Sequence, residues 1–195
     1  MRRFEQPREF YSGHDYERDV IGEVDIDDPR YKAELARLRA KAEKEGYELR
    51  DKNFLPLPYA RELVKKFQPW DPTNPGKEFL KELRLAMAEK LGLEDEKDMD
   101  RLKIFTGART PLDIFYKTDF YVSLEPGKKG QKEQIVTFDL TKDPEKSKTE
   151  TKADICVEDI VPDPSDPDFD ERIIKISESY ARRALDVIQR KEGSA

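Results

Sequence analysis

Hydrophobic residues recur at helical spacing in four parts of the chain. The broadest apolar face begins after Asn74-Pro75, which has the form of a helix start, and ends at Gly92. A narrower stripe, formed by Tyr31, Leu35, Leu38 and Ala42, begins at Pro29 and ends at Gly46. The spacing predicts helices at 29–46, 59–67, 74–92 and 169–191.

Between residues 102 and 161 the hydrophobic period changes from helical to two. Short runs rich in β-branched and aromatic residues lie at 112–116, 120–124, 134–141 and 153–157. A turn with a basic tip, 125–130, joins the second and third runs as a hairpin. We therefore predict an α/β fold with a mixed central sheet of about four strands flanked by helices.

The first part of the chain has a different character. Residues 1–30 are polar and turn-rich and are expected to form an arm, and five prolines interrupt 53–75. This indicates a polar N-terminal arm and helical extension over 1–73, followed by an α/β core domain over 74–195. The narrow stripe of the 29–46 helix suits a helix docked on one side, and it leaves a homodimer open as an alternative.

Composition excludes several classes of protein. Charged residues make up 41% of the 195 positions, but 37 Lys and Arg nearly balance 43 Asp and Glu, and aromatic residues reach 10%, which is atypical of a disordered chain. No apolar stretch is long enough to cross a membrane, and Met1-Arg2-Arg3 is not followed by an apolar signal segment. We therefore expect a cytoplasmic protein without membrane association.

The cysteine and histidine counts narrow the chemistry. One cysteine, Cys156, cannot form an internal disulfide, and one histidine, His14, leaves no ordinary zinc ligand set or histidine-based triad. The remaining candidates are carboxylates and lysines, which most simply act with a hard divalent cation bound through oxygen.

Two carboxylates lie within or beside apolar strand runs, where an unpaired charge is costly. Asp139 shares one face of the 134–141 run with Thr141, and Asp119 stands at the head of the 120–124 run. Acids on adjacent strands repel one another, and a divalent cation between them removes that penalty. The alternative is that Asp119 ends a turn and Asp139 pairs with a surface lysine.

This arrangement, an acid at one strand head, a hairpin and an acid-x-polar tripeptide on the next strand, resembles the PD-(D/E)xK nuclease superfamily over roughly residues 75–160. The resemblance implies a restriction-endonuclease-like core and a nuclease that hydrolyses phosphodiester bonds with Mg²⁺ or Mn²⁺. The partner would be a nucleic acid, with DNA preferred over RNA. Asp119 and Asp139 would bind the metal, together with a helix glutamate, Glu82 or alternatively Glu89.

The sequence departs from the family pattern at the tripeptide Asp139-Leu140-Thr141, which has threonine in the lysine position. Lys142 follows at once, but strand alternation directs it to the other face unless the strand ends there. Lys146 and Lys152 are the candidates for the missing lysine, and Lys152 is preferred because it heads the last strand. Thr141 would then hold a metal-bound water or a phosphate. Because the net charge of −6 disfavours tight nonspecific DNA binding, the alternative is a catalytically inactive α/β protein of the same scaffold that acts as a DNA- or protein-binding accessory factor.

The connection between the last two predicted strands is short. Residues 143–151 must join them, whereas a parallel crossover usually takes a dozen residues or more. Either the crossover contains a turn or two of helix, or the fourth strand is antiparallel.

Overall fold

The computed structural model describes residues 12–49, 51–128, 130–141 and 152–193. One mixed sheet lies at its centre, with the strand order β1-β2-β3-β4. The strands are β1 (Leu102–Thr106), β2 (Phe120–Leu124), β3 (Gln134–Leu140) and β4 (Ile155–Val157). The first three form an antiparallel meander, and β4 lies parallel to β3. The predicted α/β fold with a mixed sheet of about four strands is therefore confirmed.

The direction of β4 decides between the two connections that the sequence left open. A parallel neighbour must start beside the first half of β3, and Asp154, just before β4, lies there: its backbone N–H donates to Thr137 Oγ1 at 2.9 Å. The segment 142–151, which makes this connection, lies outside the described residues. The fourth strand is thus parallel to the third.

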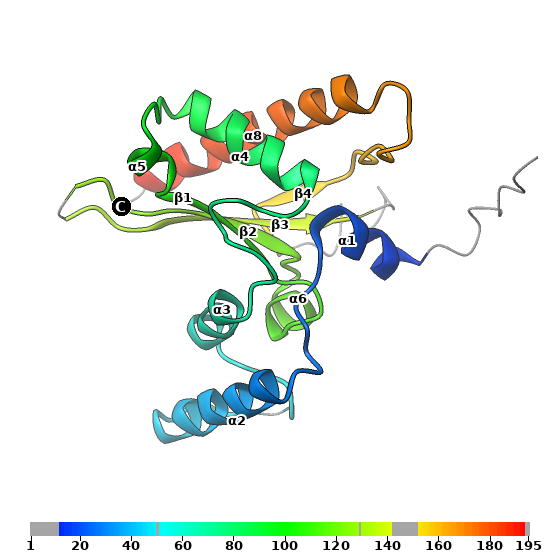
Figure 1. Cartoon of the computed structure of the whole chain (residues 1–195). Helices are drawn as coiled ribbons and strands as arrows, with labels where there is room; N and C mark the ends of the chain where they lie inside the picture. The colour runs from blue at the N-terminus through cyan, green and yellow to red at the C-terminus, as the bar shows by residue number, and fades with distance from the viewer. Residues whose placement is uncertain (1–11, 50, 129, 142–151, 194–195) are drawn as a thin grey trace, which may run out of the picture.

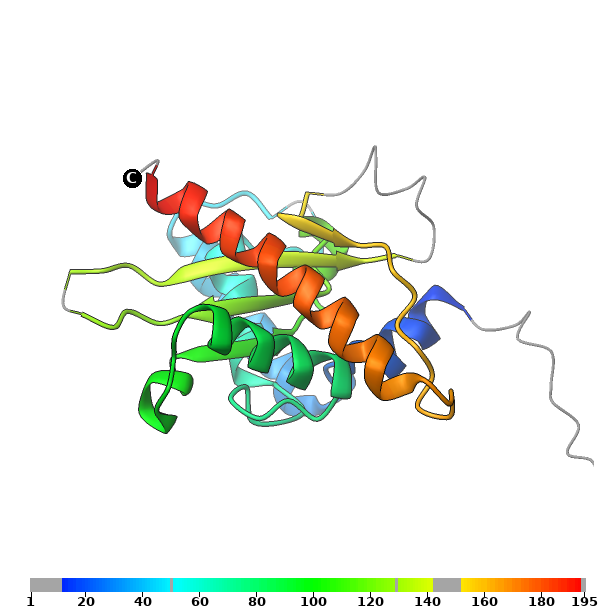
Figure 2. The same ribbon diagram turned by 90° about the horizontal axis from the view of Figure 1, so that it is seen from above.

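Two long helices cover one face of the sheet. These helices, α4 (Glu78–Lys90) and α8 (Phe169–Gly193), lie side by side across the strands in Figures 1 and 2. Alternate residues of β2 and β3, including Phe120, Val122 and Phe138, are buried beneath them in the larger hydrophobic cluster. Both helices were expected from their apolar periodicity.

Three further helices cover part of the opposite face. They are α2 (Pro29–Lys44), α3 (Leu57–Lys66) and α6 (Pro111–Tyr116), which lie below the sheet in Figure 1. Phe105 of β1 and Tyr121 of β2 point to this side and form a second hydrophobic cluster with α2 and α3. Helices α2 and α3 agree with the elements predicted at 29–46 and 59–67.

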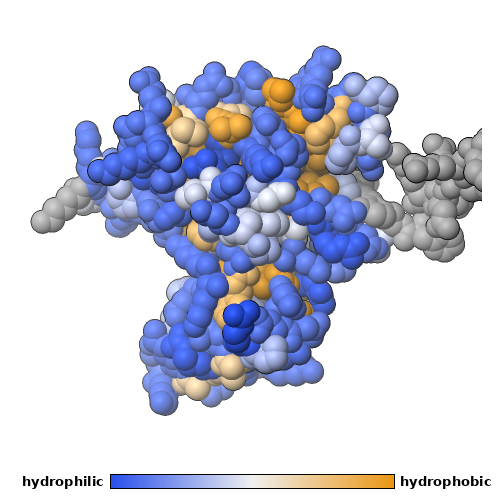
Figure 3. All heavy atoms as spheres, in the orientation of Figure 1, coloured by the Kyte–Doolittle hydropathy of each residue, from blue (hydrophilic) through white to orange (hydrophobic). Residues whose placement is uncertain are grey.

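Hydrophilic side chains dominate the surface, as Figure 3 shows, and apolar groups are visible both among the upper helices and at the waist between the sheet and the lower helices. The high share of charged residues is therefore consistent with solvated surface. No described helix combines the length and the apolar character needed to cross a membrane.

The prediction of a strand at 112–116 was wrong, because this segment is helix α6. Thr110 caps the helix by accepting a hydrogen bond from Leu112 N–H at 3.2 Å, and Pro111 occupies the first turn, where its missing N–H costs nothing. In its place the first strand is β1, which lies inside the period-two region but was not one of the predicted runs.

Residues 13–24 do not form part of a detached arm. Helix α1 (Gly13–Ile21) buries Tyr16, Val20 and Ile21 in the same cluster as α4. The Tyr16 hydroxyl also accepts a hydrogen bond from Val161 N–H at 2.9 Å. The N-terminal segment thereby reaches one end of the sheet, where it contributes to the site described below. Helix α5 (Glu96–Met99) completes the described elements that precede β1.

Candidate metal centre

Asp119 lies at the end of the sheet where β2 begins and β3 ends. Its backbone N–H donates to the Phe138 carbonyl at 2.9 Å, and its own carbonyl accepts from Gly107 N–H at 2.6 Å. Its carboxylate Oδ2 accepts from Leu140 N–H at 2.7 Å. Because these contacts tie it to the ends of both neighbouring strands, the side chain is fixed in place and only 3% exposed.

Asp139 lies next to Asp119 on β3. Phe120 stands opposite Phe138 in the antiparallel register, so the residues that flank this pair meet at the same edge of the sheet. The charge of Asp139 raises the pKa of Asp119, after the larger effects of burial, Asp113 and Glu17. The structure therefore brings together the two acids that the sequence singled out.

Two acids that the sequence analysis did not identify complete the cluster: Glu17 of α1 and Asp113 of α6. One carboxylate oxygen from each of Glu17, Asp113 and Asp119 lies within 4.8 Å of the other two. Helix α1, about a hundred residues earlier in the chain, thus meets the segment 113–119 at one point. We call Glu17, Asp113, Asp119 and Asp139 the carboxylate cluster.

Local contacts fix the position of Asp113. Its Oδ2 accepts a hydrogen bond from Arg109 N–H at 2.9 Å, just before α6 begins. Helix α6 ends at Lys117, whose backbone N–H donates to the Asp113 carbonyl at 2.9 Å. The turn from β1 into α6 also needs glycine at 107, because a Cβ there would lie 2.9 Å from the Thr118 carbonyl oxygen. The short helix therefore presents Asp113 to Asp119 on a closely packed loop.

Glu17 is positioned by the two ends of α1. Ser12 caps the helix N-terminus by accepting from Asp15 N–H at 3.1 Å. At the other end, the carbonyl of Gly22 accepts from Thr106 Oγ1 at 3.1 Å, which ties α1 to the end of β1. Gly22 has φ +66°, and a Cβ there would lie 2.3 Å from the Trp70 ring, so only glycine fits.

Burial and mutual repulsion raise the pKa values of Glu17, Asp113 and Asp119. Burial, followed by the charges of Asp113 and Asp139, raises the pKa of Glu17 to about 7. Burial also raises the pKa of Asp113, and burial with Asp113 and Glu17 raises that of Asp119 well above its usual range. A divalent cation would offset both costs, because it supplies positive charge where the carboxylates have lost water.

The donor set fits a hard cation. All the ligand atoms are carboxylate oxygens, which Mg²⁺, Mn²⁺ and Ca²⁺ prefer. Mg²⁺ binds oxygen at about 2.0–2.1 Å and Ca²⁺ at about 2.3–2.6 Å, so oxygens across one coordination sphere lie roughly 4–5 Å apart. The observed separations, all within 4.8 Å, meet this condition with little movement of the side chains.

The structure does not bring Glu82 or Glu89 to this cluster. Both lie on α4, which covers the face of the sheet formed by Phe120 and Phe138. Strand alternation directs Asp119 and Asp139 to the other face. The charges nearest to Glu82 are Glu78, Asp170 and Lys81, and burial raises its pKa more than they do. A glutamate does approach the strand acids, but it comes from α1.

Lys152 is also distant from Asp139 along the strands. It precedes Asp154, which lies beside Thr137 in the first part of the β3–β4 ladder, whereas Asp139 pairs with Cys156 further along. Lys142 and Lys146 fall outside the described residues. Thr141 follows β3, where its backbone N–H donates to the Val157 carbonyl at 3.0 Å, two residues beyond Asp139.

Of the two acids that were not predicted, Asp113 has a local sequence signal and Glu17 has none. Thr110-Pro111 is a helix-start signal, and it would have revealed that Asp113 sits in the first turn of a helix rather than in a strand. Glu17 lies in a polar segment without a distinguishing pattern. Its role depends on contacts of α1 with residues far away in the chain, such as Val161.

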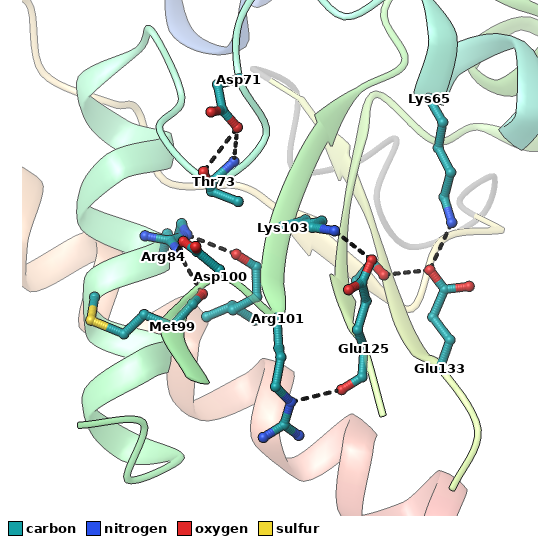
Figure 4. Close-up of polar contacts among 12 residues, drawn as sticks. Lys65, Asp71, Thr73, Arg84, Met99, Asp100, Arg101, Lys103, Glu125 and Glu133 are labelled. Atoms are coloured by element: carbon teal, nitrogen blue, oxygen red, sulfur yellow. Dashed lines mark hydrogen bonds and ion pairs between the residues drawn. The ribbon is translucent and has the colours of Figure 1, made fainter. Parts of the chain in front are cut away.

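A separate groove of about 560 Å³ lies at the opposite end of the sheet, lined among others by Asp71, Arg101, Lys103 and Glu125. Figure 4 shows its polar side chains paired with one another: Lys103 contacts the Glu125 carboxylate, and Arg101 Nε donates to the Glu125 carbonyl at 3.1 Å. Since these charges satisfy each other, the carboxylate cluster is the stronger candidate for chemistry.

Comparison with known proteins gives no relative. No protein-family model matches the chain, and searches of curated proteins and of solved structures likewise return no match. The class of the protein must therefore be argued from its own residues: an α/β fold with an acidic, oxygen-only candidate metal centre at one end of a mixed sheet.

Proposed function

We propose that this protein is a metal-dependent nuclease that hydrolyses phosphodiester bonds with Mg²⁺ or Mn²⁺. The observation that carries the proposal is the convergence of Glu17, Asp113 and Asp119 within 4.8 Å. Buried acids at this separation are costly without a cation. Two members of the carboxylate cluster, Asp119 and Asp139, are also the strand acids on which the resemblance to the PD-(D/E)xK nucleases depends.

The residues divide into roles according to their surroundings. Asp119 and Asp113, the more deeply buried acids, would hold the ion, which when bound would stabilise charge on a phosphodiester and make water a better nucleophile at neutral pH. Burial raises the pKa of Glu17 to about 7 in the metal-free cluster, and Glu17 would complete the ligand set as a carboxylate once a cation binds. Asp139 is half-buried, whereas Asp119 is buried, so Asp139 is the more accessible of the two strand acids.

This assignment alters the site expected from the resemblance. Glu17 takes the place given to Glu82 as the helix glutamate. Thr141 remains the residue two positions after Asp139, where its hydroxyl would hold a water or a phosphate. Lys152 has no role in the proposed site, because parallel pairing places it beside the other half of β3.

The second candidate is a catalytically inactive protein that binds DNA or a partner protein. The observation that favours it is Thr141 in the position where the nuclease pattern has lysine. In this alternative the carboxylate cluster would bind a cation for stability alone.

Cleavage assays separate the two functions. Supercoiled plasmid, linear duplex, single-stranded DNA and single-stranded RNA are each incubated with the protein in Mg²⁺, Mn²⁺ or EDTA. We expect metal-dependent cleavage that Asp139→Ala and Asp119→Asn abolish and that Lys175→Ala, an exposed change on α8, leaves intact. Absence of cleavage of all four substrates, or equal cleavage by the cluster variants, would refute the nuclease.

A further inference from the structure

Lys117 adopts a left-handed backbone conformation that lysine rarely takes. Its φ of 53° and ψ of 48° place it in the region that favours glycine and asparagine. Among the described residues only Arg109, with φ 67°, shares a positive φ without being glycine. These two basic residues flank α6, the helix that carries Asp113. Backbone strain of this kind concentrates at functional sites.

The sequence position of Lys117 places it between two cluster acids. Its N–H donates to the carbonyl of Asp113, four residues earlier, and Asp119 follows two residues later. Burial is the main influence on Asp113 and raises its pKa, while the nearby Lys117 ammonium acts in the opposite direction. The charge of Lys117 therefore acts on the edge of the carboxylate cluster.

The Lys117 side chain differs from that of Arg109 in what it contacts. The Arg109 guanidinium reaches Glu23 at 3.4 Å and Asp27 at 4.0 Å. Lys117 is exposed, and in the part of the chain that the structure describes no carboxylate lies within 4.0 Å of its ammonium. Among the described residues, Lys117 is thus an exposed cation beside the carboxylate cluster in the chain that has no ion-pair partner.

We propose that Lys117 binds the substrate at this site, its ammonium contacting a non-bridging oxygen of the phosphodiester. The inference rests on the proposed function, because it takes the reacting group to be an anion. Four carboxylates repel such a group, and a cation at the rim reduces that repulsion and orients the phosphate. The left-handed turn sets Lys117 between Asp113 and Asp119 along the chain, and the charge of Lys117 acts on Asp113.

The competing explanation is that Lys117 serves only as an internal counterion that stabilises the acids. The two roles differ in what they predict for Lys117→Gly, which removes the charge and relieves the left-handed strain. If Lys117 is a counterion, its loss should lower the stability of the metal-free protein. If Lys117 binds the substrate, its loss should weaken substrate binding.

The test uses a fluorescein-labelled DNA duplex and three variants: Lys117→Gly, Lys117→Arg and the exposed control Lys175→Ala. Duplex binding is measured by anisotropy in Ca²⁺, cleavage kinetics in Mn²⁺, Mn²⁺ affinity by calorimetry, and thermal stability in EDTA. For Lys117→Gly we expect KM and the duplex Kd to rise roughly tenfold to a hundredfold, as for loss of one charge-assisted hydrogen bond. Its Tm should be unchanged or slightly higher, and its Mn²⁺ affinity unchanged or tighter.

Lys117→Arg should recover most of the affinity, and Lys175→Ala should behave as the wild type. A lower Tm for Lys117→Gly with unchanged KM and Kd would overturn the inference and leave the nuclease standing. If the wild type binds the duplex but never cleaves it, and Lys117→Gly binds the duplex more weakly, the nuclease is refuted and Lys117 is retained as a phosphate-binding residue. A wild type that neither binds nor cleaves DNA would overturn both.

Discussion

The Leu140 backbone N–H donates a 2.7 Å hydrogen bond to Oδ2 of Asp119 and so joins the end of β3 to the head of β2. The contact leaves Asp119 little freedom, since its backbone is also bonded to Phe138 and Gly107. One carboxylate oxygen is thereby committed to the fold. A carboxylate held this rigidly is pre-organised for a ligand, because ordering it at binding costs little entropy.

Asp119→Asn should strongly weaken cation binding without unfolding the protein. The amide oxygen retains an acceptor for Leu140 N–H, but the ligand charge is lost, and Mn²⁺ affinity should fall by about two orders of magnitude or more. Isothermal titration calorimetry measures this directly. Glu82→Gln is the matched control, because Glu82 lies on the other side of the sheet. If Glu82→Gln weakened Mn²⁺ binding and Asp119→Asn did not, the centre would be misassigned.

The metal-free protein should lose stability as the pH rises from about 4.5 to about 7. The pKa of Glu17 is about 7 in the fold against an ordinary 4.5, so the folded state holds this proton more tightly than the unfolded chain does. The stabilisation is complete below the unfolded pKa and is lost as the pH rises through the folded one. Asp113 and Asp119 shift in the same direction.

Urea denaturation in EDTA across this pH range measures the effect. Glu17→Gln should reduce the slope of the unfolding free energy against pH, and saturating Mn²⁺ should reverse it in the wild type, because binding requires deprotonated ligands. A wild-type slope that Glu17→Gln leaves unchanged would show that Glu17 does not titrate in this range.

Arg84→Met should destabilise the fold by roughly 2–4 kcal/mol, the cost of leaving buried polar groups unpaired. The buried Arg84 guanidinium donates to the Leu102 carbonyl at 2.7 Å, at the start of β1, and to the Met99 carbonyl at 2.6 Å, at the end of α5 (Figure 4 labels Arg84 and Met99). Lys81→Met on the same helix removes only an exposed pair with Glu78 and should change stability by about 0.5 kcal/mol or less. Equal losses in chemical denaturation would contradict this.

Gly22→Ala should destabilise the protein and disturb the site together. A Cβ there would lie 2.3 Å from the Trp70 ring, and φ +66° adds strain, so a loss of about 1–3 kcal/mol is expected. Because Gly22 ties α1 to β1, Mn²⁺ affinity should fall as well. Gly13→Ala, in the first turn of the same helix with open space around it, should be neutral or slightly stabilising. Thermal denaturation and calorimetry on both variants decide it.

Local sequence pattern predicted four of the described helices and drew attention to the two strand acids. Helical spacing of apolar residues predicted α2, α3, α4 and α8, because a helix that buries one face repeats its apolar residues about every 3.6 positions. Asp119 and Asp139 stood out because a charge within an apolar run must have a reason to be there. Strand alternation also assigned Asp139 and Thr141 to the face opposite Phe138.

Short segments were less predictable. The six residues of α6 carry too few apolar positions to distinguish a period of 3.6 from a period of two, and Asp113 was therefore taken as part of a strand. The helix-start pair Thr110-Pro111 was the better guide. In segments of this length, capping chemistry tells more than periodicity.

The membership of the carboxylate cluster was decided by tertiary structure. Periodicity shows that α4 is amphipathic but not which face of the sheet it covers. Glu82 was therefore predicted to join the strand acids, although the sheet lies between them. The direction of β4 follows from pairing rather than from its own residues, and it carries Lys152 away from Asp139. Glu17 joins Asp119 only because long-range contacts fold α1 back onto the sheet. Sequence determines which side chains are costly to bury, whereas the packing of distant segments determines which of them meet.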